Sequence, residues 1–286
     1  MVRKVRNRKS RRRDRPSDAP KGFRPSKLRG QNLLIDDEVL ATIVHHADIR
    51  PSENILEIGA GTGRLTELIA PLCGALLAVE IDADLVFQLR RLVKRHRHVK
   101  VMRRDIRSID TATIFPDESY SVLGNLPYSI GTPTTVNLLQ SNHRPVRLTV
   151  MLQLEVAQRM CAKPGSMSLL SLLIQSFGSS RLLLKVPSDA FWPIPKIDSA
   201  LVRIISNEVP ADDPIVCSYL LLARHAFASR RKKLHNSLAA GLHISVGEVR
   251  SLCSESNVDP NVRPQELDLA SWRRLGKTLL GTNFVS

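Results

Sequence analysis

Short apolar runs alternate with helical stretches along most of this chain, and this alternation constrains the fold more than any other feature. Five apolar runs predict buried strands, at 54–59, 75–81, 99–104, 120–126 and 147–152. Helical periodicity precedes and separates them, at 36–47, 64–73, 83–96, 134–140 and 154–162. Strands and helices that alternate in this way predict an α/β fold, with a mostly parallel sheet and helices on both faces.

The pattern changes toward the C-terminus. Strands are predicted at 180–186 and 199–206 with only a Pro-rich segment between them, which indicates an antiparallel hairpin at the sheet edge. After the acidic, turn-like segment 207–214 the strand signals stop, and only helices are predicted. We therefore expect a catalytic domain at 27–207 and a small all-helical domain at 208–286, and 286 residues that are 43% hydrophobic suffice for both cores.

Positive charge is concentrated at the N-terminus. The chain carries a net charge of +15, and residues 1–29 hold thirteen lysines and arginines against two acids. Residues 1–26 show no apolar periodicity, so we expect a disordered arm that binds nucleic-acid phosphates. An organellar transit peptide and a solvated tail are the alternatives, whereas the lack of an apolar stretch after the basic residues excludes a secretory signal.

A second basic cluster lies near the C-terminus, with no acid inside it. Apolar residues recur around it at helical spacing from Leu220 to Leu242, which predicts an amphipathic helix with one cationic face. We expect this face to contact RNA phosphates, and the alternative is an ordinary solvated helix surface. Its candidate RNA-binding residues are Arg224, Arg230, Arg231, Lys232 and Lys233.

The cysteines and the apolar runs exclude two classes of protein. The four cysteines lie far apart and form no CxxC pair, so neither a disulfide framework nor a zinc site is expected, and a reducing compartment, the cytoplasm, fits best. No apolar run approaches the roughly 18 residues of a membrane span, which excludes an integral membrane protein.

A glycine-rich loop follows the first predicted strand. Residues 57–63 read Glu-Ile-Gly-Ala-Gly-Thr-Gly and open a helix, a position where a ligand can approach backbone N–H groups. A dinucleotide fingerprint requires GxGxxG, but here Arg64 occupies the third glycine position, which disfavours NAD and FAD. The loop instead resembles the S-adenosylmethionine loop of class I methyltransferases, with a purely structural turn as the alternative.

Acidic residues end the next two predicted strands. Glu80 follows Gly61 by 19 residues and could accept hydrogen bonds from ribose hydroxyls, and Asp105 could accept one from an adenine amino group. Any one carboxylate at a strand end could be a solvated turn residue. Because the carboxyl ends of parallel strands meet at one edge of the sheet, the three strand-end acids, Glu57, Glu80 and Asp105, together with the glycine loop predict a single ligand crevice.

The fourth predicted strand ends in Asn125-Leu126-Pro127-Tyr128. This tetrapeptide resembles the [N/D]-[P/L/I]-P-[Y/F] pattern of enzymes that methylate a planar nitrogen, including glutamine-amide methyltransferases. The carbonyls of Asn125 and Leu126 could accept the two N–H bonds of an exocyclic amine, and Tyr128 could stack on a flipped base. No cysteine neighbours the motif, which disfavours a 5-methylcytosine mechanism.

Further motifs identify a family. Residues 30–36 (GQNLLID), 152–159 (LQLEVAQR), 190–200 (AFWPIPKIDSA) and 227–238 (FASRRKKLHNSL) resemble, in order, motifs of the rRNA adenine N6-methyltransferase family, with Leu33 in place of the usual Phe. The resemblance implies S-adenosyl-L-methionine as cofactor and no metal. It implies catalytic roles for Asn125, Leu126, Tyr128 and Phe191, of which Phe191 would stack on the target base. It implies a cofactor site formed by Gln31, Asn32, Leu34, Gly59, Gly61, Glu80, Ile81, Asp105, Ile106 and Asn125.

Two branches of this family differ in substrate. KsgA-type enzymes dimethylate two adjacent adenines in a hairpin loop near the 3′ end of 16S rRNA, and Erm-type enzymes methylate a 23S adenine and confer macrolide resistance. The NLPYSIGTP segment at 125–133 favours the first branch, whereas the long basic arm favours the second. We expect a monomeric 16S enzyme that acts on the small ribosomal subunit and binds no membrane. An Erm-type enzyme and a non-catalytic ribosome-assembly factor are the alternatives.

Overall fold

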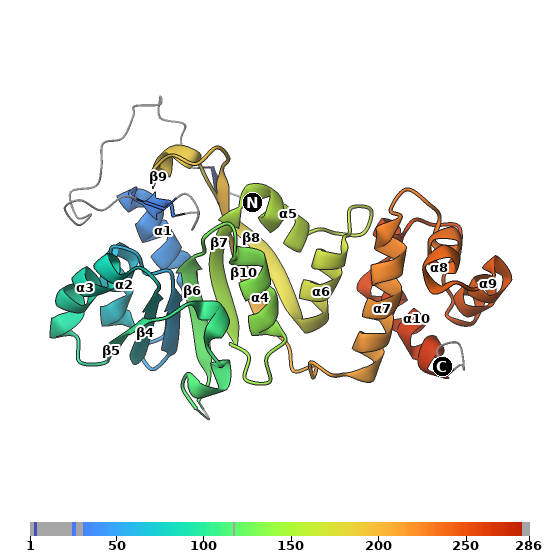
Figure 1. Cartoon of the computed structure of the whole chain (residues 1–286), viewed down its shortest axis with the longest axis horizontal. Coiled ribbons are helices and arrows are strands. Elements are labelled where there is room, and N and C mark those ends of the chain that lie inside the picture. Colours follow the sequence, from blue (N-terminus) through green and yellow to red (C-terminus); the bar gives the residue numbers. More distant parts are fainter. Residues whose placement is uncertain (1–2, 5–24, 27–30, 117, 282–286) are drawn as a thin grey trace. The chain divides into compact units, whose positions relative to one another are not determined.

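The computed structural model describes residues 3–4, 25–26, 31–116 and 118–281 (Figure 1). Internal packing divides the chain into two compact units. The first comprises Met1–Ala157 and Ser180–Ser206, and the second comprises Gln158–Ser179 and Asn207–Ser286. Most of the predicted N-terminal arm, residues 5–24, lies outside the described residues.

The first unit is built on a mixed sheet. Among the described residues its strand order is β1-β8-β10-β7-β6-β3-β4-β5; the five strands from β7 to β5 run parallel, and β10 runs antiparallel to β7. The strands are β1 (Arg3–Lys4), β3 (Asn54–Ile58), β4 (Ala75–Glu80), β5 (Val99–Arg103), β6 (Tyr120–Asn125), β7 (Arg147–Gln153), β8 (Gly178–Val186) and β10 (Ser199–Ser206). A separate antiparallel ladder joins β2 (Leu33–Leu34) to β9 (Phe191–Trp192). The predicted α/β fold is confirmed, and the two strands predicted as a hairpin, β8 and β10, are neighbours in the sheet. They are not the outermost strands, because β1 pairs with β8, so Arg3 and Lys4 of the predicted disordered arm form a strand.

Helices connect the parallel strands as predicted. Asp36 caps the first helix, because its carboxylate accepts the backbone N–H groups of Glu38 and Val39. The helices of this unit are α1 (Asp37–Ala47), α2 (Arg64–Ile69), α3 (Ala83–Leu92) and α4 (Gly131–Leu139). Short 3₁₀ turns are η1 (Ala70–Leu72), η2 (Val93–Arg95), η3 (Ile106–Ser108), η4 (Thr111–Thr113) and η5 (Ser188–Ala190). Helix α5 (Leu154–Met160) follows β7 directly and crosses the division between the units.

The second unit is built of helices in its described part, apart from Gly178 and Ser179, the first two residues of β8. Trp272, Tyr219 and Phe177 are fully buried at its centre, and the Tyr219 hydroxyl donates to Ser176 Oγ over 2.6 Å. Gly276 allows close helix packing, because a Cβ there would lie 2.7 Å from the Ile215 carbonyl oxygen. The helices are α6 (Leu169–Phe177), α7 (Pro214–Ala228), α8 (Leu234–Leu242), α9 (Val246–Glu255) and α10 (Leu269–Gly281), with the 3₁₀ turn η6 (Pro264–Glu266).

The division into two compact units differs from the predicted domains in one segment. The first unit ends at Ser206, next to the predicted boundary at 207/208, but Gln158–Ser179 belongs to the second unit instead of the predicted catalytic domain at 27–207. The reason is side-chain packing: α6 buries Phe177 and places Ser176 against Tyr219 of α7. Periodicity along the chain does not reveal such a partner.

The predicted continuous helix through the second basic cluster is wrong. Helix α7 ends at Ala228 and α8 begins at Leu234, so four of the five cations lie in the turn at 229–233. In a continued helix, cations three and four residues apart would repel one another with no acid between them. The turn also lets the Leu234 N–H reach the Val262 carbonyl oxygen over 2.8 Å, and it buries the Leu234 side chain.

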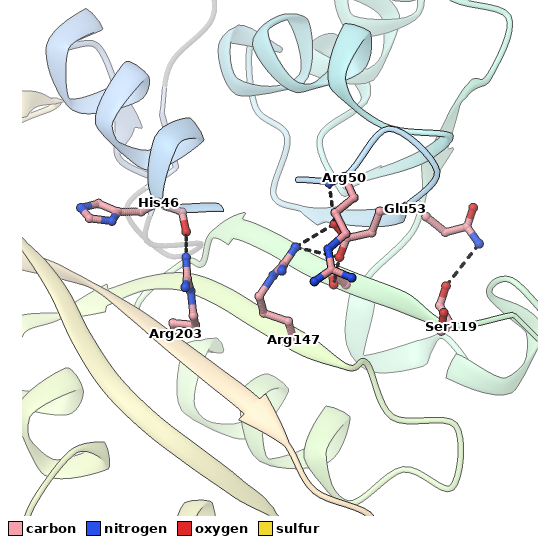
Figure 2. Close-up of polar contacts among 8 residues, drawn as sticks. His46, Arg50, Glu53, Ser119, Arg147 and Arg203 are labelled. Atoms are coloured by element: carbon pink, nitrogen blue, oxygen red, sulfur yellow. Dashed lines mark hydrogen bonds and ion pairs between the residues drawn. The ribbon is translucent and has the colours of Figure 1, made fainter. Parts of the chain in front are cut away.

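A buried ion pair joins the amino ends of three neighbouring strands (Figure 2). Arg147 at the start of β7 places Nη2 2.7 Å from both carboxylate oxygens of Glu53, just before β3. Ser121 of β6 donates to the same carboxylate, as does the backbone N–H of Arg50 over 3.0 Å. The two charged side chains are only 11% and 12% exposed. Glu53 therefore ties β3, β6 and β7 together at the edge where these strands begin.

We expect Glu53→Gln to lower the free energy of unfolding by about 3–5 kcal/mol, because the variant leaves the Arg147 guanidinium buried without a counter-charge. Urea denaturation measures this change. The double variant Glu53→Leu/Arg147→Met should recover most of the loss, since it removes both charges together. A Glu53→Gln protein as stable as the parent would contradict this role of the pair.

Candidate active site

A cavity of about 350 Å³ lies where the parallel strands end. Its walls include residues at the carboxyl ends of β3, β4, β5 and β6, where open α/β sheets bind ligands. All ten predicted cofactor residues line it: Gln31, Asn32, Leu34, Gly59, Gly61, Glu80, Ile81, Asp105, Ile106 and Asn125. Three of the four predicted catalytic residues, Asn125, Leu126 and Tyr128, line it as well.

The glycine loop needs glycine for its backbone shape. Gly59, Gly61 and Gly63 have φ angles of 73°, 59° and 89°, which other residues rarely adopt. A Cβ on Gly59 would also lie 3.2 Å from the Asn125 carbonyl oxygen. The loop therefore brings backbone from β3 and β6 close together at the cavity wall, as the sequence pattern predicts.

The Glu80 carboxylate holds this loop in place. Its Oε2 accepts the Gly61 N–H over 3.0 Å, and its Oε1 accepts the N–H groups of Ile81 and Asp82, each over 2.9 Å. Burial raises the pKa of Glu80, and the hydrogen bonds from Asp82, Gly61 and Ile81 oppose that shift. A carboxylate has about four lone-pair sites, so one remains for a ligand. Sequence reasoning predicted the ligand contact and missed the loop contacts.

Asp105 is paired with a residue that sequence reasoning missed. Arg107 Nη2 lies 2.6 Å from Asp105 Oδ2, and the Arg107 backbone N–H donates to Oδ1 over 3.0 Å. The Arg107 guanidinium holds the pKa of Asp105 below its usual range. Arg107 itself lines the cavity, as do Arg64 and Arg104. The signal was present in the sequence, since an arginine follows Asp105 by two residues.

The Asn125 amide is oriented by a backbone contact. Its Nδ2 donates to the Asn32 carbonyl oxygen over 3.0 Å, which joins the end of β6 to the segment before β2. None of the described residues donates to Asn125 Oδ1. The side chain therefore presents an acceptor oxygen within the cavity wall.

The rest of the tetrapeptide is anchored to β7 and β10. The Leu126 side chain is buried, and its N–H lies 3.3 Å from the Met151 carbonyl oxygen. The Tyr128 hydroxyl lies 2.8 Å from Ser199 Oγ, and burial raises the pKa of Tyr128. Tyr128 is thus held at its hydroxyl end and is one of the residues that line the cavity.

Phe191 does not reach the cavity, contrary to the prediction. It pairs with Leu34 between β9 and β2, and its side chain is 0% exposed within the hydrophobic core. Burying a phenylalanine ring is favourable, so presenting its face to a base would require the ring to leave that core. In this structure Phe191 supports Leu34, which lines the cavity.

The predicted RNA-binding residues lie in the second unit. Arg224 is on α7, and Arg230, Arg231, Lys232 and Lys233 lie in the following turn; all five side chains are exposed. The structure thus presents the cluster as a basic turn between two helices instead of one helix face.

Glu57 begins the glycine motif and is one of the residues that line the cavity. Its side chain is buried, and Thr66 Oγ1 donates to Oε2 over 2.6 Å. Burial raises its pKa to about 8; the Thr66 hydrogen bond opposes this shift and the negative charge of Glu80 adds to it. The folded protein therefore holds a proton on Glu57 in a pH range where the unfolded chain does not.

We expect the free energy of unfolding to fall as pH rises between the unfolded-state pKa of 4.5 and the folded-state pKa of about 8. The folded state binds the additional proton in this window, so the Glu57 contribution is lost at up to about 1.4 kcal/mol per pH unit. Glu57→Gln should flatten this part of a pH–stability profile measured by urea denaturation. The exposed-site variant Glu255→Gln is the control. Parallel profiles for parent and Glu57→Gln would contradict the buried, protonated state.

None of the described helices is both long and apolar enough to cross a membrane. The residues that the structure describes also contain no group of three His, Cys, Asp or Glu side chains arranged to hold a metal ion.

Comparisons with known proteins identify the family. The sequence profile of the ribosomal RNA adenine dimethylase family matches residues 23–279. Ribosomal RNA small subunit methyltransferase A of Dehalococcoides mccartyi is 35% identical over 248 residues, covering 86% of this chain and 85% of that protein. The protein of the same description from Geobacter metallireducens is 35% identical over 270 residues, covering 91% and 97%.

Solved structures agree with the sequence comparisons. A dimethyladenosine transferase from Plasmodium falciparum has a TM-score of 0.71 and 25% identity, covering 85% of this chain and 95% of that one. The 23S rRNA methyltransferase ErmE has a TM-score of 0.70 and 25% identity, covering 87% and 99%. This chain belongs to the ribosomal RNA adenine dimethylase family and is a methyltransferase that uses S-adenosylmethionine.

Proposed function

We propose that this enzyme dimethylates two adjacent adenines, at N6, in the hairpin loop near the 3′ end of 16S rRNA during small-subunit maturation. The single observation that carries the proposed chemistry is the Asn125 amide at the cavity wall, whose Nδ2 is held by the Asn32 carbonyl oxygen and whose Oδ1 is left as an acceptor. The proposal includes the monomeric state and the cytoplasmic location predicted from the sequence.

The cavity residues fit S-adenosylmethionine. The glycine loop offers backbone at close range, Glu80 retains one acceptor site for a ribose hydroxyl, and Asp105 can accept from an adenine amino group. A volume of about 350 Å³ lies within the usual range for small-molecule sites. When bound, this cofactor supplies an electrophilic methyl group on a sulfonium sulfur.

The protein's part in the reaction is to hold and polarise the target amine. The lone pair of an exocyclic adenine amine is delocalised into the ring, so the nitrogen is a weak nucleophile. Asn125 Oδ1 and the Leu126 carbonyl accept its two N–H bonds, which favours the tetrahedral nitrogen of the transition state. The Tyr128 ring stacks on the flipped base, and its hydroxyl contact with Ser199 restrains it.

The choice of subunit rests on the relatives. Those from Dehalococcoides mccartyi and Geobacter metallireducens are described as small-subunit methyltransferases and align with nearly the whole chain. The structural similarity to ErmE favours a second candidate, methylation of a 23S adenine. In either case the arm at 1–26 and the basic turn at 229–233 are the proposed contacts to RNA phosphates.

Methyl transfer from labelled cofactor to purified small and large ribosomal subunits, both lacking the modification, separates the two substrates. We expect label on two adjacent adenines of 16S rRNA and none on 23S rRNA. Label on 23S rRNA alone would overturn the choice of subunit, and label on neither would overturn the proposed function.

We expect Glu80→Ala to weaken S-adenosylmethionine binding by about 1–3 kcal/mol, the cost of unpaired hydrogen-bonding groups. Titration calorimetry measures the affinity, and circular dichroism checks that the variant is folded. Asp84→Ala removes an exposed acid of α3 that does not line the cavity, and its affinity should match the parent. Unchanged affinity in a folded Glu80→Ala protein would refute the ribose contact.

Asn125→Ala should lower turnover, on the rRNA that the methyl-transfer experiment identifies as the substrate, by at least about a hundredfold. In other enzymes the loss of one preorganised hydrogen-bond partner of the transition state has an effect of this size. Cofactor affinity should change far less, because the lost contact strengthens mainly as the nitrogen becomes tetrahedral.

The matched variant is Asn32→Ala, which keeps the backbone carbonyl that orients Asn125. It should weaken cofactor binding and leave turnover at saturating cofactor close to that of the parent. Near-normal turnover by Asn125→Ala would refute the proposed amine contact.

A further inference from the structure

A third concentration of positive charge lies on the first unit, and neither the cofactor site nor the basic turn accounts for it. Between positions 90 and 107 the chain has nine lysines and arginines and one acid, Asp105. All nine basic side chains are exposed. We call these nine residues the edge strip: Arg90, Arg91, Lys94, Arg95, Arg97, Lys100, Arg103, Arg104 and Arg107.

Most of this charge is not neutralised within the unit. Arg95 pairs with Glu67, and Arg107 pairs with Asp105. For the other seven, the described part of the chain supplies no carboxylate within ion-pair distance. A surface with this excess of cations attracts a polyanion.

The edge strip follows one border of the sheet to the cavity. Helix α3 packs beside β5, and β5 is the last strand in the sheet order (Figure 1). The strip passes from the end of α3 through η2 and along β5. It ends at Arg104 and Arg107, which line the cavity that holds Asn125 and Tyr128. A chain bound along the strip would thus be led to the site of methyl transfer.

An exposed aromatic ring accompanies the charges. Phe87 on α3 is 66% exposed, and the Arg91 guanidinium carbon lies 5.9 Å from the centre of its ring. Cations beside an accessible aromatic face are typical of surfaces that bind unpaired nucleotides, since phosphates contact the cations while a base stacks on the ring.

Protection of a sheet edge explains only part of the strip. Lysine and arginine on an edge strand prevent pairing with other chains, and Lys100 and Arg103 on β5 fit that role. The cations of α3 and η2 are not on the edge strand, and Arg104 and Arg107 lie at the cavity. Edge protection also gives no reason for an exposed phenylalanine.

We propose that the edge strip binds backbone phosphates of the substrate RNA beside the target adenines, and that Phe87 stacks on an unpaired base of the same RNA. This inference rests on the proposed function and extends it to a second RNA-binding surface, on the catalytic unit itself.

The test compares two triple variants that remove the same charge. The strip variant, Lys94→Gln/Arg97→Gln/Lys100→Gln, removes three positive charges of the edge strip, and none of these residues lines the cavity. The control variant, Arg50→Gln/Arg181→Gln/Arg250→Gln, removes three exposed positive charges elsewhere. The affinity of each variant is measured, over a range of salt concentrations, for unmodified RNA that contains the hairpin on which the enzyme acts. The strip variant should lower the slope of log affinity against log salt by about 2, since each lost single-strand phosphate contact removes about 0.7. The control variant should keep the parent slope.

A second pair of variants tests the role of the Phe87 ring. Phe87→Ala should bind the hairpin RNA at least about fivefold more weakly, the lower end of the effect of losing a stacked base. Leu68→Ala truncates an exposed apolar side chain on α2 and should bind as the parent does. Cofactor affinity, measured by calorimetry, should be unchanged in all four variants and shows that each is folded.

The outcomes separate the strip from the proposed function. Equal salt slopes for the two triple variants would overturn the strip as an RNA surface, because only net charge would then matter. If the strip variant lost binding to anionic lipid vesicles but bound RNA as the parent does, the strip would be a membrane-binding surface and the proposal would be overturned. A parent enzyme that methylates only 23S rRNA would refute the 16S proposal, and the slopes measured on that 23S RNA would still decide the role of the strip.

Discussion

The active site depends on the Glu80 carboxylate more than on any other group. It accepts three backbone N–H groups, one from the glycine loop and two from the segment after β4. A buried carboxylate without these partners would be strongly unfavourable, so the loop and the acid stabilise each other. The three positive-φ glycines permit the loop shape, and Glu80 determines where the loop lies. The cavity for the cofactor follows from this arrangement.

The reacting edge of the sheet is completed by contacts between segments distant in sequence. Asn125 donates to Asn32 across 93 positions, and Tyr128 meets Ser199 across 71. These contacts orient an amide oxygen and an aromatic ring within the cavity wall before any substrate arrives. Such preorganisation is how an enzyme stabilises a transition state, because little reorganisation remains for the reaction itself. At the opposite edge, Glu53 and Arg147 tie the same central strands together.

Charge is distributed according to the two tasks of the protein. Carboxylates are few at the cavity, and Glu80 and Asp105 are held there by N–H donors or by Arg107. Cations are numerous and exposed, at the edge strip on the first unit and at the basic turn on the second. The first arrangement suits a small ligand that donates hydrogen bonds, and the second suits a polyanion much larger than the cavity.

Local patterns in the sequence were sufficient to predict the parallel sheet, most helix positions, and the convergence of the glycine loop, Glu80 and Asp105 on one crevice. These features depend on periodicity, on glycine and on strand ends, which are properties of short segments. The other residues proposed for the cofactor site, among them Gln31, Asn32 and Ile106, came from the family resemblance, and they line the same cavity. Four features required the tertiary structure: the burial of Phe191, the break between α7 and α8, the membership of Gln158–Ser179 in the helical unit, and the loop contacts of Glu80. The physical reason is the same in each case. The position of a side chain or a helix end is decided by its packing and hydrogen-bond partners, and those partners lie elsewhere in the sequence.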